Sequence, residues 1–218
     1  MSSAGRPGRS RTPRKADRPA FWIIAGPNGS GKSSFYNRTD IEGWGGSIWI
    51  INPDLLTQTI VEQESLTLGE ANLAAVQRIE RWLETSIDTY QTIGVETVLS
   101  SPKYRRLVTR AHERGFLVKM IYVTLSSAAL QIERVRTRVA QGGHDVPADK
   151  IIERRRRSFA ELAWFARHVD QCSIFDNSVG DPDLIAHLSD DALVQTGGLP
   201  PDLEATLRAE GVPLVDAR

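Results

Sequence analysis

The 218-residue sequence is poor in cysteine and lacks long apolar runs. Its single cysteine, Cys172, cannot form a disulfide within the chain, and with four histidines it provides no metal-binding cluster. Cys172 lies beside Ile174 and Phe175, so we expect a buried, unreactive thiol and a reducing compartment. No run approaches the roughly 18 apolar residues needed to cross a bilayer, and the N-terminus lacks a signal-peptide core. We therefore expect a cytoplasmic protein with no membrane contact.

The chain also lacks net charge, because 27 Lys and Arg residues balance 27 Asp and Glu residues. The distribution is uneven, since residues 1–18 are rich in arginine and contain one acidic side chain, Asp17. This segment is also rich in Ser, Gly and Pro, which predicts a disordered basic tail. Such a tail is either simply solvated or tethers the domain to nucleic acid, and we expect no nucleic-acid contact elsewhere.

A complete phosphate-binding loop is present at residues 26–33. It follows the pattern G-x-x-x-x-G-K-[ST] and comes after an apolar run at residues 21–25 that predicts a buried strand. Its glycines allow the backbone N–H groups to face phosphates at the start of a helix. Lys32 is expected to reach the β- and γ-phosphates of ATP, and Ser33 to bind Mg²⁺. The residues expected to contact the nucleotide here are Gly26, Pro27, Asn28, Gly29, Ser30, Gly31, Lys32, Ser33 and Ser34.

Strand and helix patterns alternate along the rest of the chain. The apolar patterns predict further strands at residues 47–51, 95–99, 116–125 and 173–176, separated by helices at residues 69–94, 104–114 and 148–168. This order is typical of right-handed crossover units. We therefore predict an α/β P-loop fold with a five-stranded, mainly parallel sheet flanked by helices.

Two carboxylates lie at the predicted strand ends, where ligands bind in such folds. Asp54 ends the motif Asn52-Pro53-Asp54 and either takes a proton from a phosphoryl acceptor or caps the following helix. Glu96 belongs to an otherwise apolar strand. It either faces the active site, where it would hold acceptor hydroxyls or magnesium through water, or lies on a surface edge. Ser100 follows the same strand and is expected to contact the acceptor.

Arginines on two successive predicted helices suggest a lid. Arg134 and Arg138 share one helix face, and Arg154 and Arg157 are three apart on the next helix. A flexible connection at residues 141–147 separates the two helices. Arginines on such a hinge could close over ATP and stabilise charge on the transferred phosphoryl group. Successive helical residues are about 100° apart, so at most two of the four arginines at 154–157 can face one site.

These features also define the expected domain organisation. The basic tail at residues 1–18 would precede a P-loop domain at residues 19–190, with the lid at about residues 127–160. Residues 191–218 contain a Gly- and Pro-rich stretch, which predicts a linker followed by a short helix.

Several of these motifs together resemble the zeta-toxin family of small kinases. The matching segments are residues 23–33, 52–54, 96–100, 141–147, Arg154 with Arg157-Ser158, and residues 176–178. The resemblance covers about residues 20–178. It implies a P-loop kinase fold, ATP with Mg²⁺, and phosphorylation of a UDP-linked N-acetylamino sugar at its 3′-hydroxyl. It further implies an antitoxin partner that blocks the nucleotide site.

The resemblance also implies roles for individual residues. Asp54 would be the acceptor base, Glu96 an acceptor-site residue, and Arg138 and Arg154 lid contacts to phosphate, while Asn177 would lie near the adenine. The sequence departs from the family pattern at Arg155, where relatives often carry an aromatic residue. Other functions compatible with the sequence are a kinase of another small molecule, an ATPase that transfers phosphate only to water, and a nucleic-acid-associated module.

Overall fold

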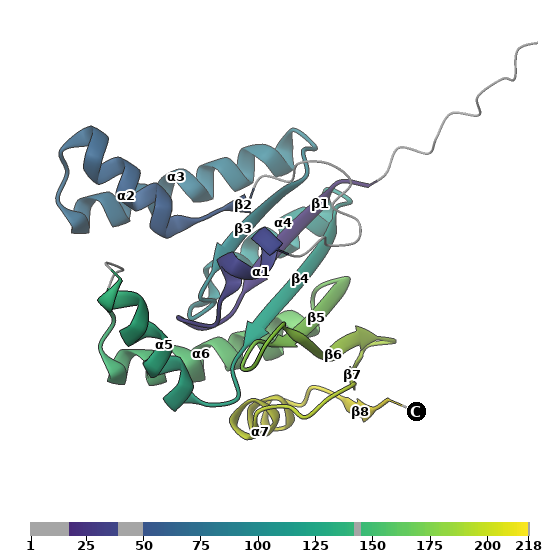
Figure 1. The fold of residues 1–218 in the computed structure, drawn as a ribbon. Helices are drawn as coiled ribbons and strands as arrows, with labels where there is room; N and C mark the ends of the chain where they lie inside the picture. The colour runs from purple at the N-terminus through teal and green to yellow at the C-terminus, as the bar shows by residue number, and fades with distance from the viewer. Residues whose placement is uncertain (1–17, 39–49, 142–144, 218) are drawn as a thin grey trace, which may run out of the picture.

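The computed structural model describes residues 18–38, 50–141 and 145–217. Figure 1 shows α2 and α3 beside β2 and β3 at one end of the molecule, and α7 with β8 at the other. The elements in chain order are β1 (Ala20–Ala25), α1 (Lys32–Arg38), β2 (Ile50–Ile51), α2 (Pro53–Glu64), α3 (Leu68–Asp88), β3 (Ile93–Thr97), the 3-10 helix η1 (Pro102–Tyr104), α4 (Arg105–Glu113), β4 (Leu117–Thr124), α5 (Ala128–Ala140), α6 (Ala148–Ala166), β5 (Gln171–Asp176), β6 (Asp183–Ser189), β7 (Ala192–Gln195), α7 (Pro201–Ala209) and β8 (Leu214–Asp216).

The described strands form one sheet in the order β2-β3-β1-β4-β5-β6-β7-β8. The five strands from β2 to β5 are parallel, which confirms the predicted α/β P-loop fold. β6 and β7 continue the sheet in antiparallel orientation, and β8 pairs parallel to β7. β1 lies between β3 and β4, so the loop that follows β1 opens at the middle of the carboxyl edge, where such sheets bind ligands.

The sheet therefore has eight described strands and not the five that were predicted. Part of the difference arises at residues 191–218, which contain the expected short helix, α7, but also β7 and β8. β7 has four residues and β8 has three, too few for an alternating pattern to distinguish a strand from a linker. Their place in the sheet comes from tertiary contacts, because β7 pairs with β6 and β8 pairs with β7.

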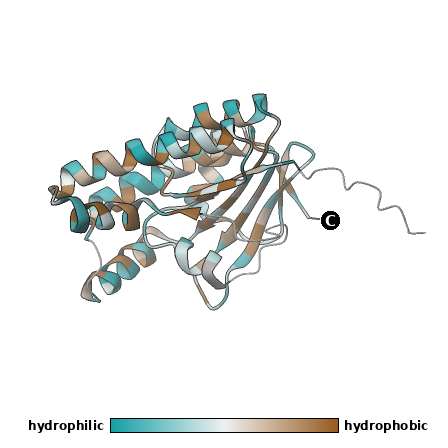
Figure 2. Cartoon of the chain, turned by 90° about the horizontal axis from the view of Figure 1, so that it is seen from above, coloured by the Kyte–Doolittle hydropathy of each residue, from teal (hydrophilic) through white to brown (hydrophobic). Residues whose placement is uncertain are grey.

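Hydrophobic residues of the central strands are buried on both faces of the sheet. On one face, Phe21 and Ile23 of β1 belong to the main core, which includes residues of α3, α4, α6 and α7. On the other face, Trp22 and Ile24 pack with Phe35 of α1. Figure 2 shows hydrophobic residues along these strands, whereas the helices are mixed. Burial on both faces explains why β1 is apolar throughout, as a parallel strand covered by helices must be.

Some expectations on local structure are confirmed and others lie outside the described residues. Cys172 is buried, and burial raises the pKa of its thiol to about 12, as expected for an unreactive cysteine. No helix within the described ranges is long and apolar enough to cross a membrane. The predicted tail up to residue 17, the start of the strand predicted at 47–51, and residues 142–144 of the lid connection are not described.

Candidate functional site

The phosphate-binding loop joins β1 to α1 in a conformation that only glycine tolerates at key positions. Gly26 has φ +146°, and a Cβ atom there would lie 2.1 Å from the backbone oxygen of Val123. Gly31 has φ +87°, and a Cβ atom there would lie 2.3 Å from Nδ2 of Asn177. Both the left-handed backbone and the close approach of neighbouring chain require glycine. The glycine spacing of the motif is thus explained by loop geometry.

Lys32 is buried within this loop. Its Nζ donates hydrogen bonds to the backbone oxygens of Gly26 at 2.9 Å and Pro27 at 3.2 Å, and it lies 4.0 Å from Oε1 of Glu96. Burial lowers the pKa of Lys32, and the negative charges of Glu96 and Asp54 oppose this shift. A phosphate bound in the loop would stabilise the ammonium in the same way, by supplying negative charge next to it.

Two other polar atoms of the loop are buried without a partner. Oδ1 of Asn28 and Oγ of Ser30 form no hydrogen bond within the part of the chain that the structure describes. Unpartnered buried polar atoms are rare in native proteins and are often explained by a ligand or solvent. Their position in the loop fits a site that binds a polar ligand such as phosphate.

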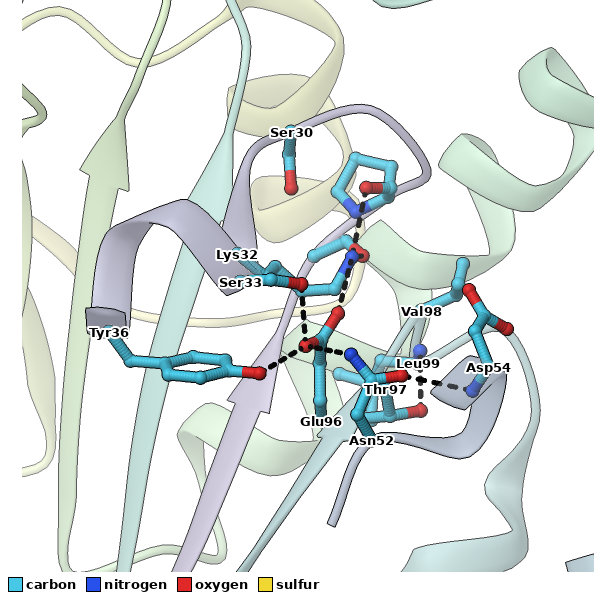
Figure 3. A network of polar contacts seen from close by, with 12 residues as sticks. Ser30, Lys32, Ser33, Tyr36, Asn52, Asp54, Glu96, Thr97, Val98 and Leu99 are labelled. Atoms are coloured by element: carbon cyan, nitrogen blue, oxygen red, sulfur yellow. Dashed lines mark hydrogen bonds and ion pairs between the residues drawn. The ribbon is translucent and has the colours of Figure 1, made fainter. Parts of the chain in front are cut away.

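Glu96 is the centre of a hydrogen-bond network beside the loop (Figure 3). Its Oε2 accepts hydrogen bonds from Ser33 Oγ at 2.8 Å, Tyr36 Oη at 2.9 Å and Asn52 Nδ2 at 2.8 Å. Burial, followed by the charge of Glu96, raises the pKa of Tyr36. β3 lies between β2 and β1, so Glu96 is not on an edge strand, and its carboxylate faces the phosphate-binding loop.

Two residues of this network were missed by the sequence analysis. Tyr36 is three positions after Ser33 in α1, and this spacing places both side chains on one helix face, which was the available signal. Asn52 was named only as the first residue of the motif that ends in Asp54. Its Oδ1 accepts hydrogen bonds from the backbone N–H groups of Asp54 at 2.9 Å and Leu55 at 3.3 Å, so Asn52 is the N-cap of α2.

Asp54 lies in the first turn of α2 and is exposed. Because Asn52 caps the helix, the alternative in which Asp54 is the cap does not hold. Asp54 instead lines a cleft of about 220 Å³ beside the phosphate-binding loop. Ser100 lines the same cleft from the segment after β3. Glu96 also lines this cleft, so the structure brings together the three residues that were expected to contact an acceptor.

A second, larger cleft of about 920 Å³ lies along the loop and extends towards β5 and the segment after it. Its lining includes Ser34, Arg134 and Asn177, three residues predicted to contact the nucleotide. Nδ2 of Asn177 donates a hydrogen bond to the backbone oxygen of Ser30 at 2.8 Å, which fixes it against the loop. The residues that line both clefts are Gly29, Lys32, Ser33, Glu96 and Arg138.

The arginines on the two helices after β4 divide into three groups. Arg138 lines both clefts, and Arg134 lines the larger one while donating to the backbone oxygen of Ser178 at 2.9 Å. Among the described residues that line these two clefts, neither Arg154 nor Arg157 is included. Arg157 is exposed and lies 3.5 Å from Glu153 on its own helix. The phosphate contacts of Arg154 and Arg157 therefore stay predictions.

Arg155 belongs to the core and not to a cleft. Its side chain is 2% exposed and forms two hydrogen bonds with the carboxylate of Asp202 in α7, at 2.7 and 2.9 Å. It also donates to the backbone oxygen of Leu125 at 2.9 Å and stacks on the ring of Phe159. The arginine that departs from the zeta-toxin pattern thus ties α6 to α7 and to the end of β4.

Most of the chain, including the phosphate-binding loop, matches the model of a known protein family. The family model described as AAA domain matches residues 21–171. The chain belongs to the AAA domain family. The matched segment of the chain includes the phosphate-binding loop, Glu96 and the arginines of α5 and α6. It ends within β5, so β6, β7, α7 and β8 lie beyond it. No curated protein matches this sequence.

Solved structures confirm the fold of this AAA domain. A structure described as the AvrRxo1-ORF1:AvrRxo1-ORF2 complex with sulphate ions has a TM-score of 0.64 and 14% identity, covering 90% of this chain and 66% of that chain. The same complex described with ATP has a TM-score of 0.62, 14% identity and coverages of 90% and 65%. The PezAT chromosomal toxin-antitoxin system of Streptococcus pneumoniae has a TM-score of 0.59, 13% identity and coverages of 90% and 86%. At such identities the likeness shows the fold alone.

Proposed function

We propose that this protein is an ATP-dependent phosphotransferase that phosphorylates a hydroxyl group of a small molecule. The observation that carries the proposal is the junction of the two clefts. Five residues line both clefts, and three of them, Lys32, Glu96 and Arg138, are charged. A phosphotransferase needs a nucleotide site and an acceptor site that meet at the transferred group, with positive charge at the meeting point.

The residues present fit a transfer reaction. With ATP in the larger cleft, Lys32 and Arg138 would neutralise charge on the γ-phosphoryl oxygens. The acceptor oxygen would bond to the γ-phosphorus as the bond to the ADP oxygen breaks, and Asp54 would take the hydroxyl proton. An ATPase that transfers phosphate only to water has no need of a second cleft with a carboxylate at its wall. The second cleft therefore favours transfer to an organic acceptor over hydrolysis.

Ser33 and Glu96 fit a magnesium site. Mg²⁺ prefers oxygen ligands, and the hydroxyl of Ser33 donates to Glu96 at 2.8 Å, which leaves the lone pairs of Ser33 Oγ available. Ser33 would bind the ion directly and Glu96 through water. Bound Mg²⁺ would supply charge neutralisation between the β- and γ-phosphates. This assignment moves Glu96 from the acceptor site to the junction, where it lines both clefts.

A UDP-N-acetylamino sugar is the favoured acceptor in this proposal. The support is the sequence resemblance to zeta toxins, together with the fold shared with the PezAT structure. The PezAT toxin-antitoxin system and the two-component AvrRxo1 complex also support a protein partner for this chain. Such a partner would cover the phosphate-binding loop or the lid helices, α5 and α6.

The proposal is tested by ADP release from ATP and Mg²⁺, measured with a panel of UDP-sugars, nucleosides and water alone. We expect a UDP-N-acetylamino sugar to stimulate release. Lys32→Ala should lower the stimulated rate by about 10²- to 10³-fold, the scale of one preorganised charged donor. Lys150→Ala is the matched control, because Lys150 is exposed on α6 and pairs with Glu153. Equal ADP release with and without every acceptor would contradict the proposal and favour an ATPase.

Asn52 offers a separate test of the magnesium site. Asn52→Asp and Asn52→Ser both preserve a good helix N-cap, but Asp places a second negative charge beside Glu96 and Ser is too short to replace the amide. We expect Asn52→Ser to weaken Mg²⁺-dependent binding of a fluorescent ATP analogue by about 10- to 100-fold, the usual cost of losing a partner of a metal ligand, and Asn52→Asp to strengthen Mg²⁺ dependence, because its added negative charge attracts the ion. Urea unfolding should show that α2 is intact. Unchanged Mg²⁺ dependence in both variants would mean that Asn52 is only a cap.

A further inference from the structure

The smaller cleft has a wall that is held rigidly by the fold. The wall is the segment from Thr97 to Lys103, which follows β3. Leu99 is buried in this segment with φ +57°, a left-handed conformation that is unusual for a non-glycine residue. Its N–H donates to Thr97 Oγ1 at 3.0 Å. Strained backbone of this kind persists where the surrounding structure holds it, and it is common at functional sites.

A buried hydrogen-bond chain from the neighbouring elements supports the same wall. Ser158 of α6 donates to the backbone oxygen of Val98 at 2.7 Å, and its hydroxyl also bonds with Tyr122 Oη of β4 at 2.7 Å. Ser158 and Tyr122 are fully buried. The segment is therefore tied to α6 and β4 and not only to its own strand. Side chains on it can hold a ligand in a fixed position.

The charges of the smaller cleft leave one cation without an assigned role. Lys32, Glu96 and Arg138 also line the larger cleft and are committed to the nucleotide end. The charged residues that line only the smaller cleft are Asp54 and Lys103. Asp54 is the proposed base for the acceptor hydroxyl. Lys103 is then the positively charged residue that can contact the part of the acceptor that does not react.

Lys103 has the surroundings of an anion-binding lysine. Its Nζ lies 4.7 Å from the centre of the Tyr104 ring, which places the ammonium against an aromatic face. Within the described ranges it forms no ion pair. Partial loss of hydration lowers the pKa of Lys103, and the negative charge of Glu80 opposes this shift. Lys103 is exposed, so an anion bound in the cleft can reach its ammonium and stabilise the charged form.

We propose that Lys103 binds an anionic group of the acceptor, so that the acceptors are molecules bearing a phosphate or a carboxylate. This inference rests on the proposed phosphotransferase function and adds a specificity residue to it. Neutral sugars and nucleosides would enter the same cleft without this contact and would be poor acceptors. The position of Lys103 on the wall, away from the junction of the clefts, makes it a residue for acceptor binding and not for the transfer step.

The test compares acceptors that differ in their anionic group. The probes are N-acetylglucosamine, N-acetylglucosamine 1-phosphate, UDP-N-acetylglucosamine and glucuronic acid, measured with Lys103→Met and Lys103→Arg. Lys103→Met should raise the KM of the preferred anionic acceptor by about 10- to 100-fold with little change in kcat, the cost of one charge-assisted hydrogen bond. Lys103→Arg should restore most of the affinity. The exposed Lys150→Met is the control for loss of a lysine charge elsewhere.

The phosphate and carboxylate probes show which anion the site takes. An equal KM for the preferred acceptor in Lys103→Met and the unaltered protein would overturn the inference, as would a preference for neutral N-acetylglucosamine. If no probe stimulates ADP release, the proposed function fails for these acceptors. Calorimetric titration of the same probes onto protein loaded with a non-hydrolysable ATP analogue then tests Lys103 independently. Binding of an anionic probe that Lys103→Met abolishes supports the site, and no binding of any anionic probe overturns it.

Discussion

Asp54→Asn is expected to lower kcat for the acceptor reaction by about 10²- to 10⁴-fold, the range for loss of a general base. Asparagine keeps the size of the side chain but does not take up a proton. Asp54 is exposed in the first turn of α2, and Asn52 holds the helix cap, so α2 should still form. Loss of a first-turn carboxylate costs only about 0.3–1 kcal/mol of helix stabilisation. The measurement is steady-state ADP release with saturating acceptor and ATP.

The control separates chemistry from binding and folding. Asp149→Asn removes an exposed first-turn carboxylate from α6 and is matched in residue type and helix position. It should leave kcat within twofold of the unaltered protein. ATP-analogue binding by Asp54→Asn should be retained, because the nucleotide is expected in the other cleft. An Asp54→Asn variant with unaltered kcat would remove Asp54 from the mechanism, and a loss of analogue binding would place it in the nucleotide site.

Arg155→Ala is expected to lower the free energy of unfolding by about 3 kcal/mol, as removal of one partner of a buried ion pair does. The variant leaves the backbone oxygen of Leu125 without its donor and opens a cavity against Phe159. Asp202 is half-exposed and can be rehydrated, which places the expected cost at the lower end for such pairs. Urea unfolding followed by circular dichroism provides the measurement.

The neighbouring residue provides the matched control. Arg156 is exposed on the same helix, so Arg156→Ala should change the free energy of unfolding by less than about 0.5 kcal/mol. Asp202→Asn should be intermediate, because it keeps a hydrogen-bond acceptor but removes the countercharge of a buried guanidinium. If Arg155→Ala unfolds at the same urea concentration as Arg156→Ala, the pair with Asp202 does not anchor α7, and another contact must hold the C-terminal segment.

The sequence signals for Asp54 and Arg155 were very different. Asp54 was found from its position after a strand, because the carboxyl ends of parallel strands meet at one edge. Arg155 was one of four consecutive arginines, of which at most two could face a site. The helical repeat predicted that they diverge, but it did not predict that Arg155 would face the core. That direction depends on the packing of α6 against α7 and β4.

The phosphate-binding loop and the succession of the five parallel strands were determined by the sequence itself, whereas β6, β7 and β8 were not predicted. The loop is local, since its glycines, Lys32 and Ser33 lie within eight consecutive residues, and its backbone geometry needs those residue types. The parallel strands were visible because burial on both faces makes them apolar throughout. Both features are patterns within short segments, so they can be recognised without knowing the tertiary contacts.

Only the tertiary structure decided which distant side chains meet. Ser33, Tyr36, Asn52 and Glu96 come from three separate segments, and their network forms because β3 lies between β2 and β1. Tertiary packing also left Lys103 and Asp54 lining one cleft, although they are 49 positions apart in the sequence. Hydrogen bonds and charge interactions act over a few ångströms in space, whatever the separation along the chain, so sequence spacing carries no record of them.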